Sequence, residues 1–111
     1  MSDLKNKIVL ITGASSGIWQ ATALAFAKQW AKIIINYNKN EAWAIQTQEL
    51  INQINWESIL IKADISDYAQ VDSMFEKIIE NFWTIDILIN NAGIIWPFGD
   101  ITDINFNDIE K

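Results

Sequence analysis

The residues whose types and spacing could do chemistry begin with a glycine- and serine-rich run, "TGASSGI", at positions 12–18. It stands between an apolar stretch and a helical pattern. Gly13 permits a tight turn, and Gly17 lets the backbone approach an anion at the helix start, where free N–H groups favour phosphate. Ser15 and Ser16 add hydroxyl donors. This context predicts a pyrophosphate-binding loop; the alternative is a glycine turn that only links strand to helix.

Polar residues also follow the later apolar stretches. Asp64 comes directly after "SILIKA", and Asn90 and Asn91 come at the end of "TIDILINN". The place of Asp64 after a strand favours a binding role, although the residue type alone suits a solvated acid near a helix start. Asn90 and Asn91 have a plain alternative as well, since asparagine caps strand ends and shapes turns.

Strand and helix patterns alternate along the chain and must position these residues. Apolar runs predict strands at 7–12, 31–37, 58–63 and 84–90, and helical spacing predicts helices at 16–29, 40–55 and 66–82. Ser66 is the expected N-cap of the third helix, and a fourth helix is expected to start near Thr102. Strands that are apolar throughout and separated by helices indicate a parallel sheet covered on both faces. Right-handed crossovers then predict a doubly wound α/β sheet of the Rossmann type, with strand order 3-2-1-4.

The first predicted helix has Ile18, Ala21, Leu24 and Ala25 at helical spacing, and we expect these residues on its inner face.

Composition excludes several classes of function. The chain of 111 residues carries a net charge of −6, which does not suit nucleic acid or an anionic membrane as partner. It has no Cys and no His, so disulfides, Cys-His metal sites, Cys nucleophiles and His general bases are excluded, and no metal site is expected. No signal peptide or apolar run of transmembrane length is present, so a cytoplasmic protein with one small domain is expected.

The run "TGASSGI", the run "NNAG" at 90–93 and the position of Asp64 between them resemble the short-chain dehydrogenase/reductase family. The resemblance covers Lys5 to Lys111, and "FWTIDILINNAGI" is especially similar to the 3-oxoacyl-carrier-protein reductases. It implies an NAD(P)(H)-dependent oxidoreductase that moves a hydride between nicotinamide and a carbonyl or alcohol carbon, with a 3-oxoacyl thioester as substrate. The alternatives are a reductase of sugars or steroids and a non-catalytic dinucleotide-binding module.

The resemblance also implies roles for residues. The glycine run binds the dinucleotide phosphates and ribose, Asp64 and the backbone of Ile65 hold the adenine, Asn91 and Gly93 line the cofactor channel, and Asn90 helps to tie the central strands. The expected cofactor-binding residues are Thr12, Gly13, Ser15, Ser16, Gly17, Ile18, Tyr37, Asn38, Lys39, Asp64, Ile65, Asn90, Asn91, Ala92 and Gly93.

Cofactor choice depends on the residue about 20 positions past the glycine run, where a carboxylate accepts from the ribose 2′-OH and selects NAD. The second strand ends in "NYNKN", with Tyr37 at that distance and no acid. NADP(H) is therefore favoured, and NAD(H) stays open. Lys39 could contact a 2′-phosphate as a point charge, or it could be an ordinary solvated lysine.

The family's catalytic Ser, Tyr-x-x-x-Lys pair and Asn do not occur before Lys111, so no catalytic residue is expected in this chain. Residues 1–111 are expected to be the N-terminal dinucleotide-binding part of one Rossmann domain, cut before its catalytic half and inactive alone. The resemblance implies a homotetramer for the full-length parent. With no later strand to pair with it, the fourth strand would have an open edge, which predicts marginal stability and aggregation.

The chain contains six tryptophans and only four glycines, whereas about eight glycines are usual for this length. Trp19 occupies the third glycine position of the family's loop, where close helix–strand packing is needed. Trp30, Trp56 and Trp83 each follow a predicted helix, at a position where glycine adopts the left-handed conformation. Trp43 and Trp96 lie at variable positions.

Our hypothesis is that these tryptophans are glycines, encoded by UGA in an A/T-rich gene and translated with the wrong table. Deliberate Gly→Trp mutagenesis, or real tryptophans in a diverged relative that does not bind a cofactor, are the alternatives.

Overall fold

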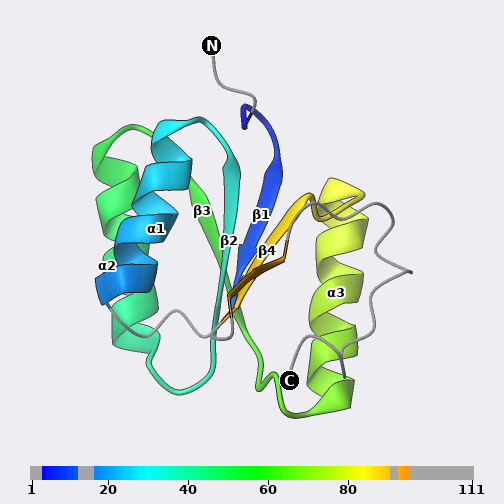
Figure 1. Ribbon diagram of the computed structural model, residues 1–111. Helices are drawn as coiled ribbons and strands as arrows, with labels where there is room; N and C mark the ends of the chain where they lie inside the picture. Colours follow the sequence, from blue (N-terminus) through cyan, green and yellow to red (C-terminus); the bar gives the residue numbers. More distant parts are fainter. Residues whose placement is uncertain (1–3, 13–16, 91–92, 96–111) are drawn as a thin grey trace.

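The computed structural model describes residues 4–12, 17–90 and 93–95, shown in Figure 1. In chain order the elements are β1 (Ile8–Ile11), α1 (Gly17–Lys28), β2 (Lys32–Tyr37), α2 (Glu41–Gln53), β3 (Ser58–Lys62), α3 (Tyr68–Phe82), β4 (Ile87–Asn90) and β5 (Gly93–Ile95). The sheet order is β3-β2-β1-β4-β5, and the first four strands in this order run parallel. The predicted parallel sheet with order 3-2-1-4 is confirmed. Trp96 and the predicted fourth helix lie outside the described residues.

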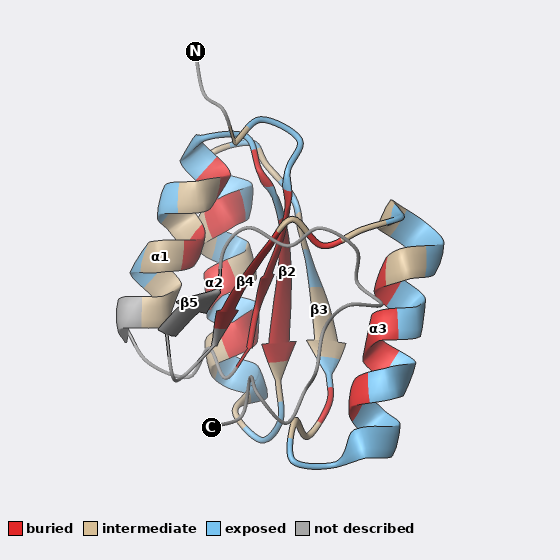
Figure 2. Ribbon diagram, turned by 45° about the vertical axis from the view of Figure 1, so that its right-hand side comes forward, coloured by how far each residue is buried: buried red, intermediate tan, exposed pale blue. Residues whose placement is uncertain are grey.

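The three helices cover both faces of the sheet, with α1 and α2 on one side and α3 on the other (Figure 1). Alternate strand residues feed two core clusters. Val9, Ile33 and Ile89 belong to the cluster on the side of α1 and α2, whereas Leu10, Ile34 and Leu88 pack with the buried face of α3. Both faces of the central strands are therefore buried, as Figure 2 shows, and this explains why these strands are almost continuously apolar.

The helix boundaries correct two expectations. Asp67, not Ser66, is the N-cap of α3, because its side chain accepts from the amides of Ala69 and Gln70. The inner face of α1 differs in part from the predicted one: Ala23 and Ala27 are buried and Leu24 packs, partly buried, against the same cluster, whereas Ala21 and Ala25 are exposed. Small residues four positions apart, Ala23 and Ala27, let α1 approach the sheet closely. The side chain of Ile18 is outside the described part.

The backbone at the tryptophans agrees with the glycine-like pattern at two positions and contradicts it at one. Trp30 and Trp83 have φ angles of 65° and 73°, in the left-handed region, as predicted. After α2, the left-handed residue is Asn55, with φ 61°, and not Trp56. Asparagine tolerates this conformation better than other residues with a Cβ, so the chain turns one residue earlier than predicted.

The Trp56 side chain is part of the packing at the start of the sheet. Its Nε1 donates to the carbonyl of Ala31 at 2.6 Å, and its ring meets that of Trp30 edge to face, with centroids 5.1 Å apart.

A short strand that the sequence did not predict lies on the outer side of β4. β5 runs antiparallel to β4 and pairs Gly93 with Asn90 and Ile95 with Leu88. The edge of the fourth strand is thus not open over these residues, contrary to the expectation above. Turning the chain back satisfies backbone groups that a parallel edge would leave unpaired.

Candidate functional site

Four of the predicted site residues lie at one edge of the sheet, because the strands that carry them are parallel. Thr12 directly follows β1, Tyr37 ends β2, Asp64 stands two residues past β3, and Asn90 ends β4. The chain steps outward from β1 to β2 and β3 and then returns to place β4 on the other side of β1. This reversal makes the carboxyl ends of β1 and β4 a topological switch point, the place where open α/β sheets generally bind ligands.

Thr12, which directly follows β1 at this switch point, is buried. Its amide donates to the Ile89 carbonyl at 2.8 Å and its Oγ1 lies 3.4 Å from the same oxygen, so β1 and β4 are held together where they end. Gly17 begins α1, with Ile18 in its first turn. The helix start, where the first N–H groups have no acceptor within the helix itself, therefore follows β1 within a few residues, as a phosphate site requires. Gly13, Ser15 and Ser16 lie outside the described residues.

At the end of β2, the first turn of α2 places an acidic residue, Glu41, beside Tyr37. The Tyr37 hydroxyl donates to Oε2 of Glu41, in the first turn of α2, at 3.2 Å. Desolvation, together with the charge and hydrogen bond of Glu41, raises the pKa of Tyr37 above its ordinary value. Asn38 and Lys39 are exposed in the loop between them. The four-residue spacing of Tyr37 and Glu41 was visible in the sequence, but only the turn into α2 makes it a contact.

Asp64 lies in a tight turn that is built around its own side chain. Its Oδ1 accepts from the Ser66 hydroxyl at 2.7 Å and from the Ser66 amide at 2.9 Å. These two hydrogen bonds, with a smaller effect of the Lys39 charge, hold the pKa of Asp64 below its ordinary value of 3.8. At neutral pH the turn presents a carboxylate. Ile65 is partly buried and packs against the core on the α3 side.

Two further residues hold this turn, and the sequence analysis missed both. Asn36 is buried with 1% of its surface exposed, and its Nδ2 donates to the carbonyls of Ile61 and Ala63 at 3.2 and 3.1 Å. Gln70, in α3, accepts from the Asp64 amide at 2.8 Å through Oε1. An asparagine inside an apolar strand and a glutamine three residues after an N-cap are the sequence signals that could have identified them.

At the end of β4 the backbone of Asn90 pairs with Gly93, so both lie at the carboxyl edge of the sheet. Asn91 and Ala92 lie outside the described residues. The role of Asn90 in tying the central strands stays a prediction.

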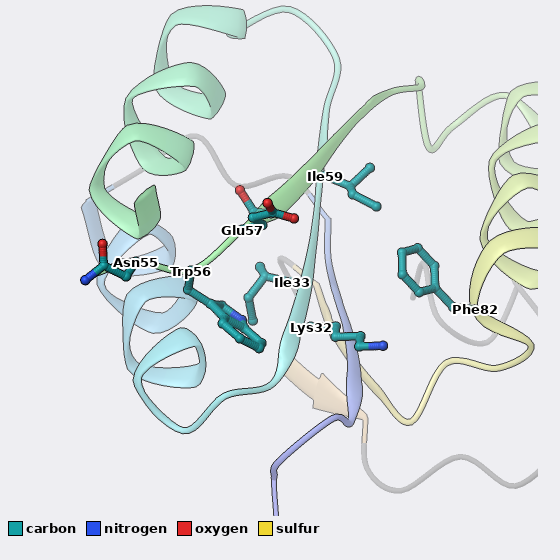
Figure 3. A pocket seen from close by; sticks show the side chains of 8 residues that line it. Lys32, Ile33, Asn55, Trp56, Glu57, Ile59 and Phe82 are labelled. Carbon is teal, nitrogen blue, oxygen red and sulfur yellow. The ribbon is translucent and has the colours of Figure 1, made fainter. Parts of the chain in front are cut away.

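In the described part of the chain, we also searched for a metal site, a membrane-spanning helix and other pockets. No group of three or more Asp, Glu, Cys or His side chains that could hold a metal occurs in it. Within the same ranges no helix is long and apolar enough to span a membrane. An open pocket of about 420 Å³ lies at the opposite, amino-terminal edge, where Lys32, Trp56, Ile59 and Phe82 line it (Figure 3). None of the predicted site residues lies there.

Comparison with known proteins gives one consistent family. The family model described as short chain dehydrogenase matches residues 7–111. An uncharacterized oxidoreductase of Thermotoga maritima is 38% identical over 109 residues, which are 98% of this chain and 42% of the relative. The short-chain dehydrogenase/reductase homolog YusS of Bacillus subtilis is 37% identical over 89 residues, which are 80% of this chain and 82% of YusS. The chain thus spans less than half of the longer relative and most of the shorter one.

Solved structures agree with the fold and add bound dinucleotides. A short chain dehydrogenase from Burkholderia cenocepacia in complex with NADP is 34% identical, with a TM-score of 0.71 over 96% of this chain and 43% of that one. An NADH-dependent reductase complexed with NAD is 31% identical, with a TM-score of 0.70 over 93% of this chain and 43% of that one.

Proposed function

Because the chain belongs to the short-chain dehydrogenase family, we propose that residues 1–111 are the dinucleotide-binding part of an NADP(H)-dependent oxidoreductase. The observation that carries the proposal is the meeting of Thr12, Tyr37, Asp64 and the start of α1 at one edge of the sheet, at its switch point. The bound cofactor would supply the hydride exchanged between nicotinamide and a carbonyl or alcohol carbon.

The described residues fit an adenine dinucleotide on the chemistry of their free groups. The N–H groups at the start of α1 suit the pyrophosphate, and the charged Asp64 in its rigid turn suits the adenine amino group. We assign the cofactor contacts to the four strand ends and their loops: Thr12, Gly13, Ser15, Ser16, Gly17, Ile18, Tyr37, Asn38, Lys39, Asp64, Ile65, Asn90, Asn91, Ala92 and Gly93.

Preference for NADP(H) over NAD(H) is part of the proposal. Tyr37 stands where a carboxylate would repel a 2′-phosphate, and Lys39 is exposed two residues later. Glu41 is the opposing charge, since its carboxylate is bound to the Tyr37 hydroxyl. The proposal requires that the charge of the exposed Lys39 outweighs that of Glu41, which already accepts a hydrogen bond from Tyr37.

For the whole protein we propose reduction of a 3-oxoacyl thioester, catalysed by Ser, Tyr, Lys and Asn residues that follow Lys111. We also propose a cytoplasmic homotetramer for this parent, by similarity to the reductases named above. A Ser and a Tyr-x-x-x-Lys pair in the reading frame downstream of position 111 would support the enzyme.

The test is a calorimetric titration of the chain, and of its Trp19→Gly form, with NADPH and NADH. We expect saturable binding of both dinucleotides by at least one form, with NADPH the tighter ligand. Absence of binding by either form would overturn the proposed function. Tighter binding of NADH would leave a dinucleotide site but overturn the NADP preference.

A further inference from the structure

The side chain of Gln70, in the first turn of α3, accepts a hydrogen bond from a residue that precedes the helix. In the usual capping box, the third helical residue bonds to the amide of the N-cap residue. Here the amide of the N-cap, Asp67, donates to the Asp64 carbonyl at 3.0 Å instead, and Gln70 Oε1 accepts from the Asp64 amide at 2.8 Å. Gln70 Nε2 donates to Asp67 Oδ2 at 3.1 Å, which determines the end of the Gln70 amide that faces Asp64.

The peptide group between Ala63 and Asp64 is therefore held from both sides. Asn36, on β2, donates to its carbonyl at 3.1 Å, and Gln70, on α3, accepts from its N–H at 2.8 Å. The two side-chain amides belong to different elements: Asn36 lies on β2, the neighbour of β3 in the sheet, and Gln70 lies in the first turn of α3. A peptide fixed in this way cannot rotate without the loss of a hydrogen bond at one end, so the orientation of Asp64 is set before any ligand arrives.

The turn leaves one acceptor and one donor unused. Asp64 Oδ1 is engaged by both Ser66 groups, and the Asp64 carbonyl is engaged by the Asp67 amide. In the part of the chain that the structure describes, neither Asp64 Oδ2 nor the Ile65 amide has a hydrogen-bond partner. An anionic acceptor followed by a backbone donor matches the edge of adenine, which offers an amino group beside a ring-nitrogen acceptor.

Hypoxanthine is the informative competitor, because it has a carbonyl oxygen in place of the amino group and an N–H in place of the acceptor nitrogen. Opposite the same two groups it would set oxygen against carboxylate and donor against donor. A site of buried or preorganised polar groups rejects a ligand that leaves them unpaired more strongly than it rejects a change in apolar shape.

We propose that Gln70 is a positioning residue for adenine recognition: it holds the Ala63–Asp64 peptide, with Asn36, so that Asp64 and the Ile65 amide distinguish adenine from other purines. The inference rests on the proposed function, because it needs a dinucleotide at this edge of the sheet. Gln70 itself does not contact the ligand in this proposal.

The test compares NADPH with its hypoxanthine analogue by calorimetry, in the form of the chain that binds NADPH. The measured quantity is the ratio of the two dissociation constants, because a loss of stability alone would weaken both ligands alike. We expect a ratio of about ten or more in the parent, the value of one hydrogen bond to a charged group, and about two or less in Gln70→Ala.

Two variants make the result specific. Gln70→Glu, combined with Asp67→Asn so that two carboxylates do not face each other, keeps an oxygen acceptor for the Asp64 amide, so this double variant should retain most of the parent's ratio. Gln46→Ala makes the same change at an exposed glutamine of α2, and its ratio should equal the parent's.

An unchanged ratio in Gln70→Ala, or equal losses in Gln70→Ala and in the double variant with Gln70→Glu and Asp67→Asn, would overturn the positioning role while the dinucleotide site stands. A parent that does not distinguish the two purines would also overturn it. Failure of every form to bind NADPH would remove the proposed function and this inference together.

Discussion

Trp30 and Trp83 share one backbone conformation, with φ angles of 65° and 73°; Trp83 directly follows α3, and Trp30 lies two residues past the end of α1. A residue with a Cβ holds the left-handed conformation at a cost of roughly 1–2 kcal/mol, which glycine avoids. The indole of Trp83 is 86% exposed and does little to offset that cost, whereas Trp30 packs edge to face on Trp56. Both positions have the geometry of a glycine C-cap, which fits the hypothesis that glycine is the native residue there.

Replacing Trp83 by glycine should therefore stabilise the chain. We expect Trp83→Gly to raise the free energy of unfolding by about 1 kcal/mol, because relief of the left-handed strain exceeds the entropy cost of glycine. In a domain of this size that is a rise in Tm of about 4–8 °C, measured by thermal unfolding. Trp83→Ala is the control, since it removes the indole but keeps the Cβ. Equal Tm values for the two variants would show that the conformation carries no strain.

A separate prediction concerns the protein isolated from its own cells, in which we expect glycine and not tryptophan at position 19. The mass of the peptide Ile8–Lys28, isolated from those cells, should correspond to glycine at position 19, the one tryptophan in that peptide. Peptides that contain positions 30 and 83 should show glycine as well. A mass that corresponds to Trp19 would contradict the hypothesis and support a diverged or mutated protein.

Trp19→Gly should exchange stability for cofactor affinity. The partly buried indole packs against the core cluster on the side of α1, where glycine would let the helix lie closer to the sheet. We expect NADPH to bind about tenfold more tightly, the effect of one recovered charge-assisted hydrogen bond. The free energy of unfolding should fall by about 2 kcal/mol, because the packing of the indole is lost. Trp43→Gly makes the same change in α2 and should not tighten binding. Unaltered NADPH affinity in Trp19→Gly would show that the indole does not affect the phosphate site.

Lys39→Gln should weaken NADPH binding more than NADH binding. The lysine is the positive charge nearest in sequence to the position that distinguishes the two cofactors, and an exposed ion pair contributes up to about 1 kcal/mol, or roughly fivefold in affinity. Titrations with both dinucleotides measure the effect, and Lys28→Gln, at the far end of α1, is the matched control. Equal effects on NADPH and NADH would separate Lys39 from any 2′-phosphate.

Removing the Ser66 hydroxyl should raise the pKa of Asp64. The hydroxyl and amide of Ser66, and then Lys39, favour the charged carboxylate, so the pKa is below 3.8 in the folded chain. The stabilisation is therefore complete above pH 3.8 and is lost as the pH falls through the lowered pKa. In Ser66→Ala the pKa should move toward 3.8, as followed by NMR of the Asp64 carboxyl carbon, whereas Ser73→Ala, on the exposed side of α3, should leave it in place. A pKa of Asp64 that is the same in both variants would contradict this account.

The local sequence was sufficient for the fold class and for the edge of the sheet at which the candidate site residues lie. Short apolar runs such as "IVLI" and "III" predict strands buried on both faces, and the helices between them indicate that those strands are parallel. Parallel strands end at the same edge, so Thr12, Tyr37, Asp64 and Asn90 had to meet there whatever the details of packing. The left-handed backbone at Trp30 and Trp83 was predictable for the same kind of reason, since a helix end imposes it within a few residues.

Only the tertiary structure decided which face of α1 is buried, where β5 pairs and what holds the Asp64 turn. The α1 stripe depends on how closely a helix can approach a particular pair of strands, which Ala23 and Ala27 determine together with the sheet. β5 depends on a free edge that exists only once β4 is in place. Asn36 and Gln70 hold one peptide group from two elements that are far apart in the sequence, and no local pattern of either residue type specifies a partner at that distance.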